Sequence, residues 1–139
     1  MAPRFTAVTL AGQPRTFPDD FKGQLVLLDF WATWCGPCKA ELPHVAAAYE
    51  KLRARGFEVV GVTLDDTQHV TADRVTRFAA ERKMTWPQVY ADAASIAQRF
   101  GVSGIPAAFL VDGTTGTILA SGAELRGAGL TAAIEKHLK

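Results

Sequence analysis

Two cysteines, three positions apart, are the residues of this sequence best suited to chemistry. Cys35 and Cys38 enclose Gly36 and Pro37, and the chain has no other cysteine. Thiol–disulfide exchange needs an attacking thiolate and a second thiol that resolves the mixed disulfide. The C-x-x-C spacing supplies both, whereas two cysteines are too few for a disulfide-rich scaffold or a four-cysteine zinc site. The pair therefore indicates redox chemistry.

The position of the pair suggests a role for each cysteine. A helical pattern begins at Pro37, directly after an apolar strand-like run. Cys35 is expected at the exposed N-terminus of that helix, where free backbone N–H groups and the helix dipole lower the pKa of a thiol. We assign Cys35 as the nucleophile and Cys38 as the resolving thiol. The alternatives are two inert buried cysteines or half of a zinc site, but no histidine has ligand spacing relative to the pair.

An acidic residue interrupts the preceding apolar run. Residues 25–32 suit a strand buried on both faces, apart from Asp29. Burial raises the pKa of a carboxyl group and makes it a proton acceptor near neutral pH. We expect Asp29 to lie below the pair and to accept the Cys38 proton, directly or through a water molecule. Glu41, one turn after Cys38, is a second candidate for handling this proton, and the structural alternative is an Asp29 that reaches solvent.

Strands and helices alternate along most of the chain. A hairpin is predicted first, with strands at 5–10 and 15–17. Further strands are expected at 25–32, 57–64, 86–90, 107–111 and 117–121. Helices are expected at 37–56, 71–83, 93–100 and 127–138. This order predicts an α/β fold with a central mixed β-sheet flanked by helices.

Length and composition fit one globular domain. The chain has 139 residues, 48% of them hydrophobic and 21% charged. We expect a single domain over residues 1–139, with an N-terminal hairpin extension at 1–24 and an insertion at about 65–92. The net charge is +1 with the two signs interspersed, which argues against nucleic acid as a partner. No apolar stretch reaches the ~20 residues that span a bilayer, and no signal peptide is visible at the start.

Several motifs together resemble the thioredoxin superfamily. Residues 30–39, Phe-Trp-Ala-Thr-Trp-Cys-Gly-Pro-Cys-Lys, are similar to its active-site segment, and Asp29 falls on its buried acid. Residues 100–106 resemble its cis-proline loop, and residues 121–123 resemble its glycine loop. The hairpin, the insertion and the sequence of residues 38–43 resemble the TlpA/ResA branch. Classical thioredoxins carry a lysine beside the buried acid, whereas residues 58–64 contain none.

The resemblance implies a thioredoxin fold, a cis bond before Pro106 and a protein-disulfide reductase that cycles between dithiol and disulfide. It also implies a substrate-binding rim, made of Trp34, Gly36, Pro37, Ile105, Pro106 and Gly122. No cofactor is expected beyond the redox-active disulfide. The implied partners are protein thiols and disulfides and an upstream thiol reductant, with the chain itself a monomer.

Location and two other functions stay open at this point. TlpA/ResA proteins are usually anchored or exported in bacteria and often act in cytochrome c maturation. This implies a periplasmic or extracytoplasmic location if a signal or anchor was removed, and a cytoplasmic location otherwise. A membrane contact is expected only through a segment absent from this chain. A copper chaperone is the first alternative, although such relatives use a wider C-x-x-x-C. A thiol peroxidase is the second, although Ala32 stands where that group has threonine.

Overall fold

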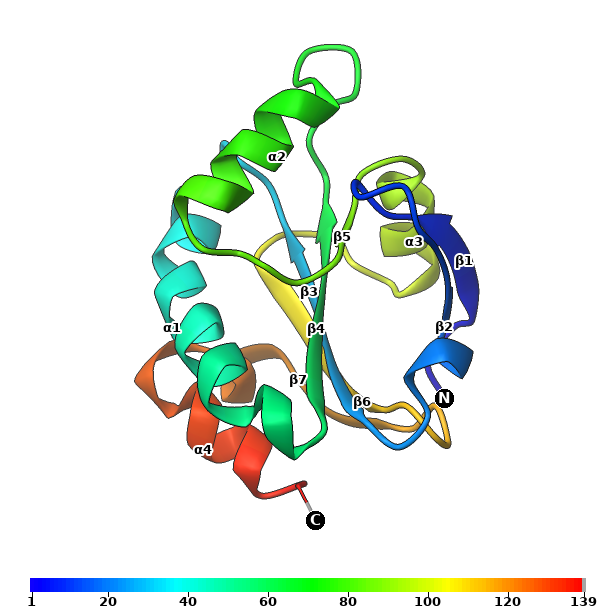
Figure 1. Cartoon of the computed structure of the whole chain (residues 1–139), viewed down its shortest axis with the longest axis vertical. Helices are drawn as coiled ribbons and strands as arrows, with labels where there is room; N and C mark the ends of the chain where they lie inside the picture. The colour runs from blue at the N-terminus through cyan, green and yellow to red at the C-terminus, as the bar shows by residue number, and fades with distance from the viewer. Residues whose placement is uncertain (139) are drawn as a thin grey trace.

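A five-stranded mixed sheet forms the centre of the computed structural model, which describes residues 1–138 (Figure 1). The strand order is β5-β4-β3-β6-β7, with β3 parallel to β4 and antiparallel to β6. The strands are β3 (Leu25–Trp31), β4 (Phe57–Thr63), β5 (Gln88–Val89), β6 (Ala107–Asp112) and β7 (Ile118–Ser121). The central β3 is buried along its whole length, as its apolar sequence predicts.

Helices cover both faces of this sheet (Figure 1). The helices are α1 (Gly36–Leu52), α2 (Ala72–Glu81), α3 (Ala93–Arg99) and α4 (Leu130–Glu135). Buried residues of α1, α2 and α4 belong to one apolar cluster, and those of α3 belong to a second. We call the side of the sheet covered by α1, α2 and α4 the α1 face. No helix within residues 1–138 combines the length and the apolar character needed to cross a membrane.

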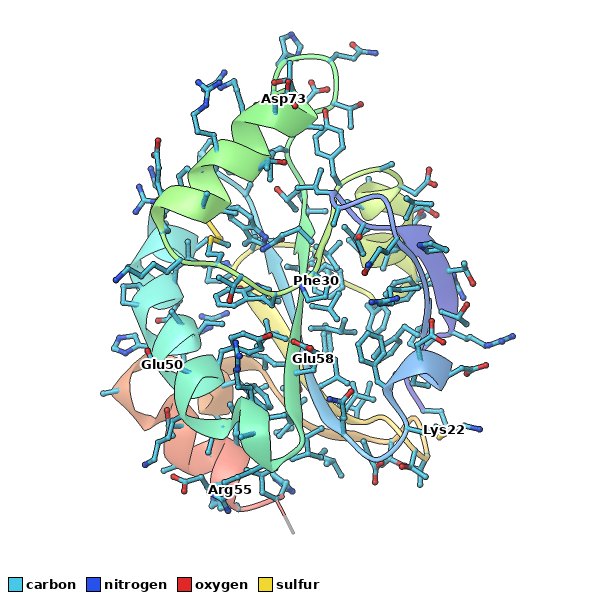
Figure 2. All side chains as sticks on the ribbon, in the orientation of Figure 1. Lys22, Phe30, Glu50, Arg55, Glu58 and Asp73 are labelled. Carbon is cyan, nitrogen blue, oxygen red and sulfur yellow. A yellow bond between two sulfur atoms is a disulfide. The ribbon has the colours of Figure 1, made fainter. Side chains whose placement is uncertain are left out.

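Alternation along β3 divides its side chains between these two clusters. Leu25, Leu27 and Trp31 pack on the α1 face. Val26, Leu28 and Phe30 pack on the opposite face, where Phe30 lies in the interior of the molecule (Figure 2). Successive side chains of a strand point to opposite faces, so Asp29 belongs to the α1 face, between Leu27 and Trp31. The register of one strand thus places the acid under the helix that carries Cys38.

The N-terminal hairpin covers the α3 side and one sheet edge. Strands β1 (Phe5–Val8) and β2 (Pro14–Phe17) pair antiparallel, and the rings of Phe5 and Phe17 stack on each other. The following residue Thr9 bridges to Val89 of β5. Unpaired strand edges invite association with other chains, so this bridge protects the short edge strand β5.

Most of the predicted elements are confirmed, although α1 ends at Leu52 and β5 is shorter than expected, and the segment between β7 and α4 differs most. The closing helix, expected over residues 127–138, is limited to α4, and a 3-10 turn at Gly127–Gly129 precedes it. Gly127 has a φ of +72°, outside the helical region, and glycine is a poor helix former. A second 3-10 turn, Gly122–Leu125, was not predicted. Both turns join β7 to α4, and the Gly127–Gly129 turn contacts α1.

Candidate active site

The first turn of α1 is built around the two cysteines. Cys35 is the N-cap residue of α1, and Pro37 occupies the first turn, where its missing N–H removes no helical hydrogen bond. The backbone N–H of Cys38 donates to Cys35 Sγ over 3.2 Å. The two residues form a disulfide, with Cα atoms 5.2 Å apart. A sulfur that accepts an N–H at a helix N-terminus is stabilised as a thiolate once the disulfide is reduced.

Exposure differs sharply between neighbouring residues of this segment. Trp34 is 63% exposed, whereas Trp31 is fully buried, as expected for a residue of the apolar run 25–32. Cys35 is only 4% exposed, so the expectation of an exposed nucleophile is wrong for the disulfide form. The reason is that the Cys35 sulfur turns toward the helix, bonds to Cys38 and joins the apolar cluster of the α1 face.

The loop before β6 lies beside the active-site segment. The bond between Ile105 and Pro106 is cis, in agreement with the resemblance. Phe30 pairs with Ala107 in the antiparallel β3–β6 register, so the two preceding residues of the loop continue past the end of β3. The guanidinium of Arg126 donates to the carbonyl oxygen of Pro106 over 2.6 Å. The segment that joins β7 to α4 therefore holds the cis-proline loop from its outer side.

The other residues of the predicted rim lie around this loop and the start of α1. Gly36 and Pro37 are exposed in the first turn of α1, and Gly122 begins a 3-10 turn with a φ of +69°. Contact of these residues with a substrate stays a prediction. A second cis bond, before Pro18, was not anticipated.

Asp29 is a buried acid on the α1 face. Its side chain is 7% exposed, and desolvation raises the pKa of Asp29 from 3.8 to about 7, with a smaller contribution from the negative charge of Glu41. Glu41 in turn accepts a hydrogen bond from the backbone N–H of Gly127 over 2.8 Å. Strand register places Asp29 on the face that α1 covers, and within residues 1–138 it makes no hydrogen bond to either sulfur. The two acids named from the sequence are therefore close enough for the charge of Glu41 to act on Asp29.

A buried carboxylate at the end of β4 anchors the segment that leads into Cys35. Asp65 accepts hydrogen bonds from the backbone N–H of Thr33, over 3.1 and 3.2 Å, and from its hydroxyl over 2.6 Å. The hydroxyl of Thr63 donates to the same carboxylate. We call these three residues the Asp65 clamp. No motif spacing predicts it, but the C-terminal ends of parallel strands meet at one sheet edge, which is where an acid after β4 can reach the residues after β3.

Loss of the Asp65 clamp should slow exchange without abolishing it. Thr33→Val removes the hydroxyl donor at nearly constant volume, and we expect the rate of disulfide exchange to fall by about three- to tenfold, because Cys35 is held less firmly. Thr33→Ser keeps the hydroxyl and should restore most of the rate. Stopped-flow measurement of both variants checks this. Equal rates for valine and serine would contradict a role for the hydroxyl.

Within the described residues 1–138, no group of three or more His, Cys, Asp or Glu side chains is placed to hold a metal ion.

Known proteins similar to this chain share both its fold and its activity class. Residues 1–120 match the AhpC/TSA family. A thiol-disulfide oxidoreductase ResA from Bacillus thuringiensis is 30% identical over 99% of this chain and 75% of its own length. The thioredoxin domain of a thiol-disulfide oxidoreductase from Bacteroides vulgatus superposes with a TM-score of 0.85 at 32% identity, covering 99% of this chain and 95% of that one.

A solution structure of a thiol:disulfide interchange protein from Bacteroides sp. superposes with a TM-score of 0.83 at 32% identity, over 99% of this chain and 87% of that one. The match to the family model spans the hairpin, the cysteine pair, the Asp65 clamp and the cis-proline loop. On this match, and with a thioredoxin fold shared across the whole chain, the protein belongs to the AhpC/TSA family of the thioredoxin superfamily.

Proposed function

We propose that this thiol-disulfide oxidoreductase works in the reducing direction on protein disulfides. The Cys35 thiolate attacks one sulfur of the substrate disulfide and displaces the other as a thiolate, which takes up a proton. Cys38 then loses its proton and attacks Cys35 Sγ. The second substrate thiol leaves, and the Cys35–Cys38 disulfide remains. Two electrons have passed to the substrate, and an upstream dithiol returns the enzyme to its reduced form.

The observation that carries this proposal is the disulfide at the N-cap of α1. The Cys35 sulfur accepts the N–H of Cys38, and Cys38 is bonded to it from one turn further along the helix. The first sulfur is thus the one that the helix N-terminus favours as an anion. The second is held within reach of it, one turn into the helix, and accepts no such hydrogen bond within residues 1–138. This asymmetry supports Cys35 as nucleophile and Cys38 as resolving thiol.

Asp29 is proposed as the acceptor of the Cys38 proton. It lies on the face of β3 that α1 covers, and its pKa of about 7 allows it to be ionised before proton transfer and neutral afterwards at physiological pH. Glu41 lies one turn after Cys38 but is held by the N–H of Gly127. We therefore assign the proton transfer to Asp29 and an electrostatic influence on Asp29 to Glu41.

Substrate binding is proposed at the exposed Trp34 and the cis-proline loop. Ile105 lies two residues before β6, so an extended substrate segment can pair with its backbone by strand addition. The rim made of Trp34, Gly36, Pro37, Ile105, Pro106 and Gly122 supplies the apolar contacts. Protein disulfides outside the cytoplasm, such as those formed during cytochrome c maturation, are the substrate class that the resemblance to ResA supports.

The reduction potential of the Cys35–Cys38 couple tests the direction of electron flow. Equilibration with glutathione, read by the emission of Trp34, should give a potential below about −200 mV, as for reducing members of the fold. A value near the roughly −120 mV of a strong oxidant would contradict a reductase. Reduced enzyme should also consume hydrogen peroxide far more slowly than a peptide disulfide. The reverse order of rates would favour a thiol peroxidase.

A further inference from the structure

A row of four residues crosses the sheet at the level of Asp29. In the strand register, Gln88 of β5 pairs with Gly61 of β4, Gly61 pairs with Asp29 of β3, and Asp29 pairs with Ala108 of β6. Residues in register on neighbouring strands direct their side chains to the same face. Two of the four are glycine and alanine, so Gln88 and Asp29 are the two polar side chains of this row on the α1 face.

Because Gly61 has no side chain, the space between Gln88 and Asp29 is open to the side chain of Gln88. A Cβ atom at Gly61 would lie 2.1 Å from Gln88 Oε1 and 2.7 Å from Gln88 Nε2. These distances are shorter than any real contact, so the Gln88 amide occupies the space above Gly61. The Gln88 side chain therefore extends along the row toward Asp29 rather than away from the sheet.

The orientation of the Gln88 amide is fixed by a tryptophan. The indole N–H of Trp31, which can only donate, donates to Gln88 Oε1 over 2.9 Å. Gln88 Nε2 is consequently the atom that remains available, and within residues 1–138 it has no hydrogen-bond partner although Gln88 is only 4% exposed. A buried donor without a partner is costly, and such groups deserve a functional explanation. Trp86 Nε1 is the other such group in this part of the chain.

We propose that Gln88 is a positioning residue whose side-chain N–H donates, directly or through one water molecule, to the carboxylate of Asp29 during proton transfer from Cys38. This inference rests on the proposed role of Asp29. Gln88 stabilises the charged form of Asp29 until the proton arrives. The hydrogen bond from Trp31 to Gln88 Oε1 keeps Gln88 Nε2 directed toward Asp29. A neutral amide from the inserted strand β5 thus acts where β4 offers no cationic side chain.

The other groups around Asp29 do not stabilise its charged form. The neighbours of Asp29 on β3 that share its face are Leu27 and Trp31, both uncharged. From β4 and β6 the row contributes Gly61 and Ala108. From α1, Glu41 faces Asp29 and opposes its ionisation, and Cys38 is part of the disulfide. Gln88 is therefore the donor in this row that can favour the charged form of Asp29.

The ionisation of Asp29 tests the proposal without any measurement of turnover. In the disulfide form, the midpoint of the Asp29 carboxyl titration can be followed by carbon NMR. Gln88→Met removes the donor at similar volume and should raise the midpoint by about one pH unit, a tenfold weaker acid. Gln88→Glu keeps an oxygen for Trp31 but replaces the donor with an acceptor, so it should raise the midpoint as well.

Trp86→Phe is the matched control, because it removes the other unpartnered N–H from the same apolar cluster and leaves Gln88 in place. Its Asp29 midpoint should equal that of the parent. An unchanged midpoint in both Gln88 variants would overturn the proposal, and so would a Trp86→Phe shift as large as that of Gln88→Met. If Asp29→Asn exchanges disulfides as fast as the parent, the catalytic role of Asp29 fails, while the titration still decides whether Gln88 contacts it.

Discussion

Replacing Cys35 with serine should lower disulfide reduction by more than about a thousandfold. A hydroxyl remains protonated at neutral pH, so the helix N-terminus at residue 35 has no thiolate to stabilise. The fold should survive, because serine is close in size and the surrounding α1 face is otherwise unchanged. Reduction of a peptide disulfide with excess upstream dithiol measures the loss. Thr33→Ser, which alters the same segment but no sulfur, is the control.

Cys38→Ser should fail at a different step. Cys35 can still attack, but the mixed disulfide has no resolving thiol, so substrate should remain bound through one disulfide per protein molecule. Mass spectrometry under non-reducing conditions detects this adduct, and added dithiol should release it. If the trapped species instead formed on Cys38 in Cys35→Ser, the assignment of the two roles would have to be reversed.

Asp29→Asn should make the protein more stable above neutral pH. The pKa of Asp29 is 3.8 in the unfolded chain and about 7 in the fold, so between these values the folded state binds more protons than the unfolded state. Its contribution to stability is complete below pH 3.8 and is lost as the pH rises to about 7. At 1.36 kcal/mol per pKa unit, the ionised buried acid destabilises the fold by about 4 kcal/mol at pH 8.

Asparagine removes that charge at every pH. We expect the free energy of unfolding of the variant to exceed that of the parent by about 2–4 kcal/mol at pH 8. The lower end of this range allows for an asparagine amide whose hydrogen bonds are incompletely satisfied. The difference should shrink toward pH 4. Denaturant unfolding of the disulfide forms at pH 4, 6 and 8 measures it. Glu50→Gln, which neutralises an exposed acid on the outer side of α1 (Figure 2), should show no such trend.

The same substitution should slow the second half of the reaction. Without an acceptor for the Cys38 proton, resolution of the mixed disulfide should become slower and lose its dependence on a group that titrates near pH 7. The first attack by Cys35 should change little. A stability difference that stays constant between pH 4 and pH 8 would contradict both the burial and the ionisation assigned to Asp29.

The reactive pair and the elements that carry it follow from local features of the sequence. Apolar runs that fit buried strands, and helical patterns between them, reflect local rules of burial and periodicity. The C-x-x-C motif needs only one turn of helix to bring its sulfurs together, so its chemistry follows from spacing. The buried acid was visible for the same reason, because an aspartate inside an apolar strand stands out without any tertiary information.

The contacts that distant parts of the chain make at the site depend instead on the three-dimensional packing. The Asp65 clamp joins residues 32 positions apart, and the contact of Gln88 with Trp31 joins residues 57 positions apart. Neither contact has a sequence pattern, since each depends on the strand order and on the register of the strands. A register shift of one residue would turn the side chains to the other face of the sheet. The burial of Cys35 likewise depends on which way its sulfur turns. Local spacing fixes which groups can react, whereas packing across the sheet fixes which neighbours control their protons.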